Sequence, residues 1–339
     1  MTVRAYISGC AGTELDAGEK ALFASAPPWG LILFQRNCQS AEQISALVAS
    51  FRDVVGRPDA PVLIDQEGGR VQRLRPPLAP NYPPAARFAE LHAIESGAGL
   101  RAARLGARLI AEDLIRLGIN VDCLPVLDVG LPITHQVIGD RAYGGELATI
   151  IALGRAVCEG LLEAGVLPVI KHIPGHGRAM ADSHLELPVV DTPAAELAAT
   201  DFVPFAALAD MPLAMTAHVV YSALDADRPA TTSPTVISEI IRGHIGFDGL
   251  LMSDDVSMKA LSGSIGERSE AAIAAGCDVV LHCNGEAAEM AEVAEAAPVL
   301  AGEAARRAAA AMALLARGRA PFDEIAARGE FEGLFSALA

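Results

Sequence analysis

The sequence predicts an α/β protein built as a single-domain (β/α)8 barrel, that is, a TIM barrel. Three observations lead to this prediction: short apolar runs recur along the chain, helical patterns separate them, and polar side chains follow the ends of the runs. Alternating strands and helices are typical of a parallel sheet covered by helices. Eight strand candidates favour a closed barrel, with an open doubly wound sheet as the alternative.

The strand candidates are continuous apolar runs, and none of them alternates polar with apolar side chains. Such runs indicate strands that are buried on both faces of a parallel sheet. The eight candidates are residues 3–7, 30–34, 61–64, 119–126, 167–170, 212–216, 249–253 and 278–282.

The helix candidates repeat apolar residues every three to four positions. The pattern at 40–55 begins with Ser40 and Gln43 at the spacing of a capping box, and the patterns at 99–118 and 149–165 end in glycine. Further helical patterns cover about 194–209, 234–243, 267–275 and 286–317, and the last of these is expected to pack on the outside of the barrel.

No long linker, charge block or internal repeat divides the chain. The proline-rich segment 73–88 is predicted to be a stiff surface loop rather than a domain boundary. Residues 1–339 are therefore expected to form one catalytic barrel domain, with a C-terminal helical segment at about 286–339 packed on it.

Polar side chains, most of them ionisable, directly follow six of the strand candidates. In a barrel these positions share the C-terminal rim, where barrel enzymes hold their active sites. The alternative is that a strand simply ends in polar residues. The positions are Asp65, Asp128, Lys171 with His172, His218, Asp254 and Asn284.

Composition narrows the function classes. The formal net charge of −16 argues against broad binding to nucleic acid or to an anionic membrane surface. No apolar stretch approaches the ~20 residues of a membrane span. The six cysteines form no C-x-x-C pair, which favours a reducing cytoplasm as the location. Because only nine residues precede Cys10, a lipoprotein leader is not expected.

The segment "KHIPGHGRAMADSH" at 171–184 raises the choice between metal binding and proton transfer. His172 and His176 have the spacing of two zinc ligands on a helix, but the proline and glycine between them make that helix improbable. A zinc site built from His172, His218 and Asp254 remains the alternative, which would make the protein a zinc-dependent barrel hydrolase.

Proton transfer is favoured by Asp182 and His184. In an extended segment these two side chains project to the same side, so the carboxylate can orient the imidazole. Asp254 and Asp255 end a strand candidate; one can face a pocket as a nucleophile while the other caps the next segment. A carboxylate nucleophile opposite a proton donor is the arrangement of a retaining glycosidase.

Five motifs occur in order: "LIDQEGGRVQR" (63–73), "GDRAYG" (139–144), "KHIPGHG" (171–177), "DSH" (182–184) and "SDDVSM" (253–258). In this set the chain resembles glycoside hydrolase family 3, and in particular its single-domain bacterial cytosolic β-N-acetylglucosaminidases (β-hexosaminidases) of cell-wall recycling. One departure is Ile173, where the family commonly has an aromatic residue.

The resemblance implies a role for each matching residue. Asp254 would be the nucleophile, and His184 the acid and base, with Asp182 as its partner. The N-acetylglucosamine unit would be bound by Asp65, Arg73, Arg141, Lys171 and His172, whereas His176 would hold the loop. The expected substrate is a muropeptide or chitooligosaccharide carrying N-acetylglucosamine, with no cofactor and no metal. Because a neutral histidine repels an incoming anion less than a carboxylate does, partial phosphorylase activity is a further hypothesis.

Overall fold

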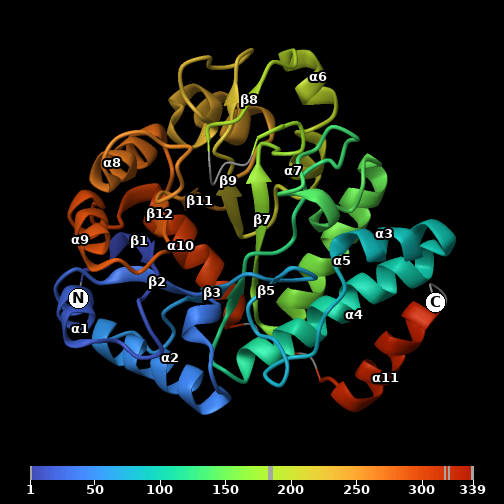
Figure 1. Cartoon of the computed structure of the whole chain (residues 1–339), viewed down its shortest axis with the longest axis horizontal. Helices are drawn as coiled ribbons and strands as arrows, with labels where there is room; N and C mark the ends of the chain where they lie inside the picture. Colours follow the sequence, from blue (N-terminus) through green and yellow to red (C-terminus); the bar gives the residue numbers. More distant parts are fainter. Residues whose placement is uncertain (1, 182–185, 317, 320, 337–339) are drawn as a thin grey trace.

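The computed structural model describes residues 2–181, 186–316, 318–319 and 321–336. Eight parallel strands close into a barrel in the order β1-β12-β11-β9-β7-β6-β3-β2 (Figure 1). The chain therefore has the predicted (β/α)8 fold, and every strand candidate supplies one barrel strand. The strands are β1 (Arg4–Ser8), β2 (Pro28–Leu33), β3 (Val62–Ile64), β6 (Val121–Asp122), β7 (Leu167–Ile173), β9 (Leu213–Thr216), β11 (Leu250–Asp255) and β12 (Val279–His282).

Two strands run further than their apolar stretches predict. β7 continues through Lys171 and His172, and β11 continues through Asp254, so these polar residues belong to the strands instead of following them. Backbone pairing holds them there, since Lys171 pairs with Met215 of β9 and Asp255 pairs with Leu281 of β12.

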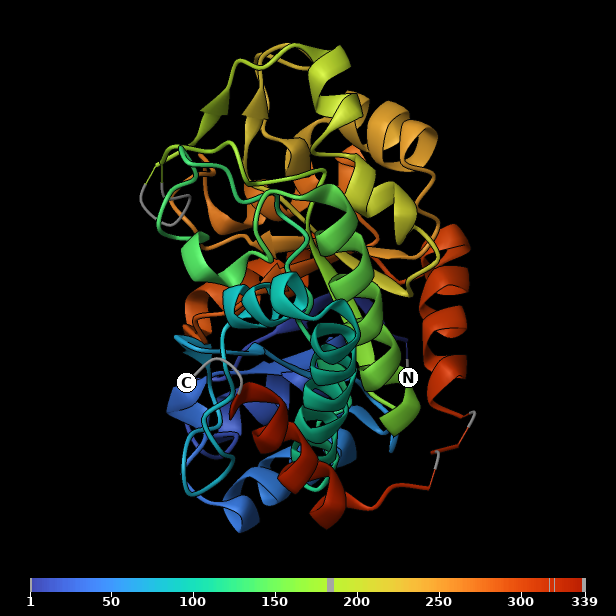
Figure 2. The ribbon, with the colours of Figure 1, turned by 90° about the vertical axis from the view of Figure 1, so that its right-hand side faces the viewer.

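The helices lie around the barrel, and Figures 1 and 2 show α4 and α5 packed along one side with α11 against α4. Ser40 caps α2 as predicted, because its hydroxyl accepts a hydrogen bond from the Gln43 amide at 3.2 Å. The Gln43 side chain does not complete the capping box, since its oxygen accepts from the Gln39 amide instead.

The helices are α1 (Ala17–Ser25), α2 (Ala41–Val55), α3 (Ala85–Ile94), α4 (Ser96–Ile115), α5 (Leu147–Ala164), α6 (Ala194–Ala199), α7 (Val203–Ala207), α8 (Ile265–Ala275), α9 (Ala287–Ala296), α10 (Gly302–Leu315) and α11 (Glu324–Phe335). Short 3-10 turns lie at η1 (Gln35–Asn37), η2 (Gly139–Arg141) and η3 (Ala230–Thr232), and η4 (Val236–His244) is a π-helix. Among the described residues, no helix has both the length and the apolar character that crossing a bilayer requires.

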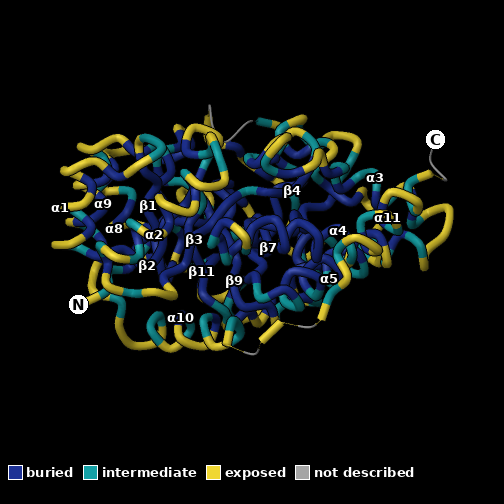
Figure 3. Tube along the Cα trace, turned by 90° about the horizontal axis from the view of Figure 1, so that it is seen from below, coloured by how far each residue is buried: buried dark blue, intermediate teal, exposed yellow. Residues whose placement is uncertain are grey.

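The expectation of one outer helix over 286–317 is wrong. Two helices form there, because α9 ends before Pro298, and a residue that precedes proline is biased away from the helical conformation. Ala308 and Ala311 of α10 pack into the apolar cluster that fills the barrel, together with side chains such as Ile7 and Val169. Figure 3 shows α10 on the side of the barrel away from β4. This helix thus covers one end of the barrel.

Two small sheets lie outside the barrel. β4 (Gln66–Gly68) and β5 (Val71–Gln72) form a short antiparallel hairpin, and β8 (Val189–Val190) pairs with β10 (Val220–Tyr221).

The proline-rich loop after β3 is ordered by two glutamines. Gln66 bonds the backbone of Arg73 and Leu74, and Gln72 bonds the backbone of Tyr82. The loop ends where α3 begins, at Ala85, so the last residues of the predicted loop are helical.

Candidate active site

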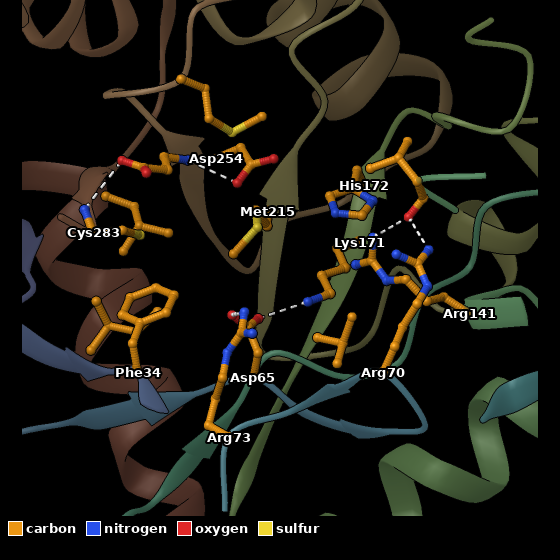
Figure 4. Close-up of a pocket in the computed structure, with 16 residues that line it drawn as sticks. Phe34, Asp65, Arg70, Arg73, Arg141, Lys171, His172, Met215, Asp254 and Cys283 are labelled. Atoms are coloured by element: carbon orange, nitrogen blue, oxygen red, sulfur yellow. Dashed lines mark hydrogen bonds and ion pairs between the residues drawn. The ribbon is translucent and has the colours of Figure 1, made fainter. Parts of the chain in front are cut away.

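A cavity of about 360 Å³ lies among the C-terminal ends of the barrel strands. Six of the eight site residues predicted from the sequence line it: Asp65, Arg73, Arg141, Lys171, His172 and Asp254 (Figure 4). The other two, Asp182 and His184, lie outside the described residues. The rest of the lining is Ile32, Phe34, Arg70, Val71, Val137, Met215, Asp255, Met258, Leu281 and Cys283.

Asp65 is held between two cations. Its carboxylate accepts hydrogen bonds from Nζ of Lys171 at 2.9 Å and from Nη2 of Arg73 at 2.9 Å. Burial raises the pKa of Asp65, but the charges of Lys171 and Arg73 outweigh it and hold the pKa well below its usual range. Asp65 is therefore a fixed carboxylate, able to accept from sugar hydroxyls with its remaining lone pairs.

Glu67 links Lys171 to a third cation of this network, Arg141. It lies 2.7 Å from Nζ of Lys171 and accepts two hydrogen bonds from Arg141, each of 2.8 Å. Burial raises the pKa of Glu67, yet Arg141 and Lys171 lower it to about 2. A planar guanidinium bonded at two points has little freedom to turn, so Glu67 fixes the direction of Arg141.

His172 is oriented by Asp128. The Nδ1 atom of the ring lies 2.7 Å from the Asp128 carboxylate, which also accepts from the backbone amides of His172 at 3.2 Å and His176 at 2.6 Å. Because Nδ1 is engaged there, the Nε2 edge of the ring is the one available to a ligand. His176 itself is buried, and that burial lowers the pKa of its ring to about 4.

The paired aspartates of β11 have different surroundings. Asp255 accepts from Ser257 at 2.6 Å and from the Cys283 amide at 3.1 Å, which ties its carboxylate to the following turn and to the end of β12. The carboxylate of Asp254 accepts from the Asp255 amide at 2.8 Å. In Figure 4, Asp254 lies above Met215 and Asp65 lies below it.

The zinc alternative gains no support from this geometry. The described residues contain no group of three or more His, Cys, Asp or Glu side chains placed to hold a metal ion. The two ring nitrogens of His218 are bonded within the scaffold, to Thr231 at 2.7 Å and to the Asp255 carbonyl at 3.0 Å. His218 therefore links Thr231 to the backbone at the end of β11.

The family model for the glycosyl hydrolase family 3 N-terminal domain matches residues 17–313. The chain belongs to glycosyl hydrolase family 3.

Relatives of this family 3 chain include a beta-hexosaminidase of Methylococcus capsulatus. It is 42% identical over 277 residues, and the match covers 80% of this chain and 80% of the relative. A beta-hexosaminidase of Xanthomonas axonopodis pv. citri is 37% identical over 323 residues, or 94% of this chain and 93% of the relative. The crystal structure of NagZ from Neisseria gonorrhoeae in complex with N-trifluoroacetyl-D-glucosamine superposes with a TM-score of 0.88 at 30% identity, covering 98% of both chains. The family resemblance is confirmed, and the protein is a glycoside hydrolase.

Sequence reasoning missed several residues of this family 3 site. Glu67 stands two positions after Asp65, within the motif at 63–73, but the sequence does not show which cations it contacts. Asp128 was noted only as a rim residue, and its bond to His172 joins two strand ends that are distant in sequence. Arg70 and Met258 stand within the motifs at 63–73 and 253–258, and Phe34 and Met215 within strand candidates, but no residue pattern assigns these four side chains to the cavity.

Proposed function

We propose that the protein is a retaining exo-β-N-acetylglucosaminidase, which removes terminal, non-reducing N-acetylglucosamine from peptidoglycan fragments in the cytoplasm. The observation that carries the proposal is that Asp254 lines the same cavity as the hydrogen-bonded cluster of Asp65, Lys171 and Arg73. The names of the relatives and the sugar derivative bound by the gonococcal NagZ support the same substrate class.

The polar cluster suits the hydroxyl groups of a sugar. Asp65 accepts from a hydroxyl, Lys171 and Arg73 donate to oxygens, and Arg141 and His172 complete the set from neighbouring strands and loops. Each cation already has a carboxylate partner, so a neutral sugar meets oriented donors and acceptors without having to neutralise a buried charge.

The reaction has two steps. In the first, a carboxylate oxygen of Asp254 attacks the anomeric carbon, the glycosidic bond breaks, and His184 gives its proton to the leaving oxygen. In the second, His184 takes a proton from water, whose oxygen displaces Asp254 and releases the sugar with retained configuration. Asp182 orients the imidazole throughout. The roles of His184 and Asp182 are transferred from the "DSH" motif.

The test compares 4-nitrophenyl β-N-acetylglucosaminide with the plain β-glucoside. The proposal expects turnover of the first, little of the second, and a loss of roughly 10³-fold or more in kcat for Asp254→Asn, because the amide cannot form the glycosyl-enzyme. Equal turnover of both glycosides would reject the N-acetylglucosamine assignment. Repeating the assay in phosphate buffer, with detection of sugar 1-phosphate, separates phosphorolysis from hydrolysis.

A further inference from the structure

Arg70 lines the cavity but has had no role so far. It stands at the turn of the β4–β5 hairpin, and its side chain is about half exposed, at 46%. Its Nη2 atom donates to the carbonyl oxygens of Gln136 and Val137 at 2.6 Å each, and to that of Ile138 at 3.3 Å. The Arg70 guanidinium is therefore hydrogen-bonded to three consecutive backbone carbonyl groups in the segment before η2.

This segment leads directly to Arg141. The Val137 carbonyl accepts from Arg141 Nη1 at 2.9 Å as well as from Arg70, and Figure 4 shows the two guanidinium groups converging there. The positive charges of Arg70 and Arg141 repel each other at the Val137 oxygen, and a counterion beside each guanidinium reduces that repulsion. Glu67 supplies the counterion for Arg141, and Asp140 lies 3.3 Å from Arg70.

The hairpin thus holds Arg141 in two ways. Glu67 on β4 bonds the Arg141 guanidinium directly, and Arg70 at the hairpin turn bonds the backbone that carries it. The turn that presents Arg70 requires its two glycines. Gly68 and Gly69 have φ of 98° and 56°, and a Cβ on Gly68 would lie 2.3 Å from the Pro83 carbonyl oxygen.

We propose that Arg70 is a positioning residue, which sets the place of residues 136–140 and through them orients Arg141 in the sugar site. The inference rests on the proposed function, in which Arg141 contacts the sugar. Its ion pair with Asp140 is half exposed on both sides and contributes little, so the carbonyl contacts carry the effect. All three carbonyl contacts come from the Nη2 atom of Arg70, and the ammonium of a lysine, whose side chain is one bond shorter, reaches them only in part.

A double-mutant cycle tests the route through Arg141. With 4-nitrophenyl β-N-acetylglucosaminide as substrate, Arg70→Ala is expected to lower kcat/KM by roughly 10- to 100-fold, the range expected for a displaced contact. In the Arg141→Ala background, the same change is expected to lower it by less than about two-fold, because there is no longer a guanidinium to orient. Arg70→Lys should recover only part of the activity.

The control is Arg75→Ala, which removes a nearby arginine side chain whose one hydrogen bond to the described residues is to the Arg70 carbonyl oxygen, at 3.2 Å, and should leave kcat/KM unchanged. If Arg70→Ala does not fold, as judged by its melting temperature, Arg70→Lys takes its place in the cycle. Equal losses in both backgrounds, or no loss in either, would overturn the inference. A wild-type enzyme without activity on this substrate, or one indifferent to Arg141→Ala, would instead reject the proposed function.

Discussion

Lys171 shows how the site is ordered at the scale of single residues. Its ammonium group is almost fully buried and lies between Asp65 at 2.9 Å and Glu67 at 2.7 Å. Burial lowers the pKa of a lysine, but here the two carboxylates outweigh it and hold the pKa of Lys171 above its usual range. The ammonium remains charged and in place before any sugar binds, so binding costs little reorganisation of this side chain.

His184→Ala tests the assignment of the acid and base. Protonating the leaving oxygen matters most when the leaving group is a poor one, such as a sugar alcohol, and least for a nitrophenolate. We expect kcat/KM to fall by about 10² to 10⁴ on a disaccharide substrate, and by much less on 4-nitrophenyl β-N-acetylglucosaminide. An unchanged rate on the disaccharide would remove His184 from the mechanism.

Polar residues at the ends of strand candidates were predictable, whereas the residues that position them often were not. Asp65, Lys171 and Asp254 stand at ends of apolar runs, so the pattern itself points to them. Glu67 and Asp128 act through contacts with Arg141 and His172, which only the closure of the barrel brings near. No local pattern in a sequence reports a contact between segments more than forty residues apart.

At the scale of elements, strands were easier to predict than helices. Burial on both faces leaves an uninterrupted apolar run, which is a strong local pattern. Helix α1, which buries only Glu19 and Phe23, has a weak apolar stripe and was not predicted. For α1 a pattern did exist: Asp16 and Glu19 form a full capping box. Pro298, likewise, was the visible reason for the break between α9 and α10.

Gly177→Ala tests the segment that connects β7 to the part of the sequence containing Asp182 and His184. A Cβ at Gly177 would lie 2.0 Å from the carbonyl oxygen of Val129, a backbone atom that cannot move alone. We expect a destabilisation of about 1–3 kcal/mol in urea unfolding, together with reduced kcat. Gly329→Ala is the matched control. It lies in α11 with nothing within 4 Å of its Cβ, so it should be neutral or gain up to about 1 kcal/mol. Full activity of Gly177→Ala would show that the loop tolerates the shift.

At the scale of the whole molecule, barrel closure makes the site. The cavity draws its lining from β2, β7, β9, β11 and β12 and from the loops after β3 and β6. A chain of this topology places every strand's C-terminal end on one rim, which is why rim residues were predictable as a set. α10 packs into the barrel's apolar interior, and the polar cavity lies among the strands' C-terminal ends.

The buried ionisable groups also fix how the whole fold responds to acid. Glu67 and Asp128 have pKa values of about 2 when folded, because Arg141 and Lys171 beside Glu67, and His172 and His176 beside Asp128, outweigh the effect of burial. The stability they contribute is present above their ordinary pKa values of 4.5 and 3.8, and is lost as pH falls toward 2. His176 is a base whose pKa burial lowers from 6.5 to about 4, so its contribution is lost between those two values as pH falls.

Asp122 acts in the opposite direction. Burial raises its pKa from 3.8 to about 8, so the folded state holds a proton that the unfolded state releases, and stability increases as pH falls through that window. Between pH 6.5 and 4 the gain from Asp122 offsets the loss from His176, whereas below pH 4 the losses from Glu67 and Asp128 are unopposed. We therefore expect the free energy of unfolding in urea to stay nearly level from pH 6.5 to 4 and to drop steeply below 4. In Asp122→Asn the offset is absent, so stability should decline from pH 6.5 downward. Parallel pH profiles for the two proteins would contradict this assignment.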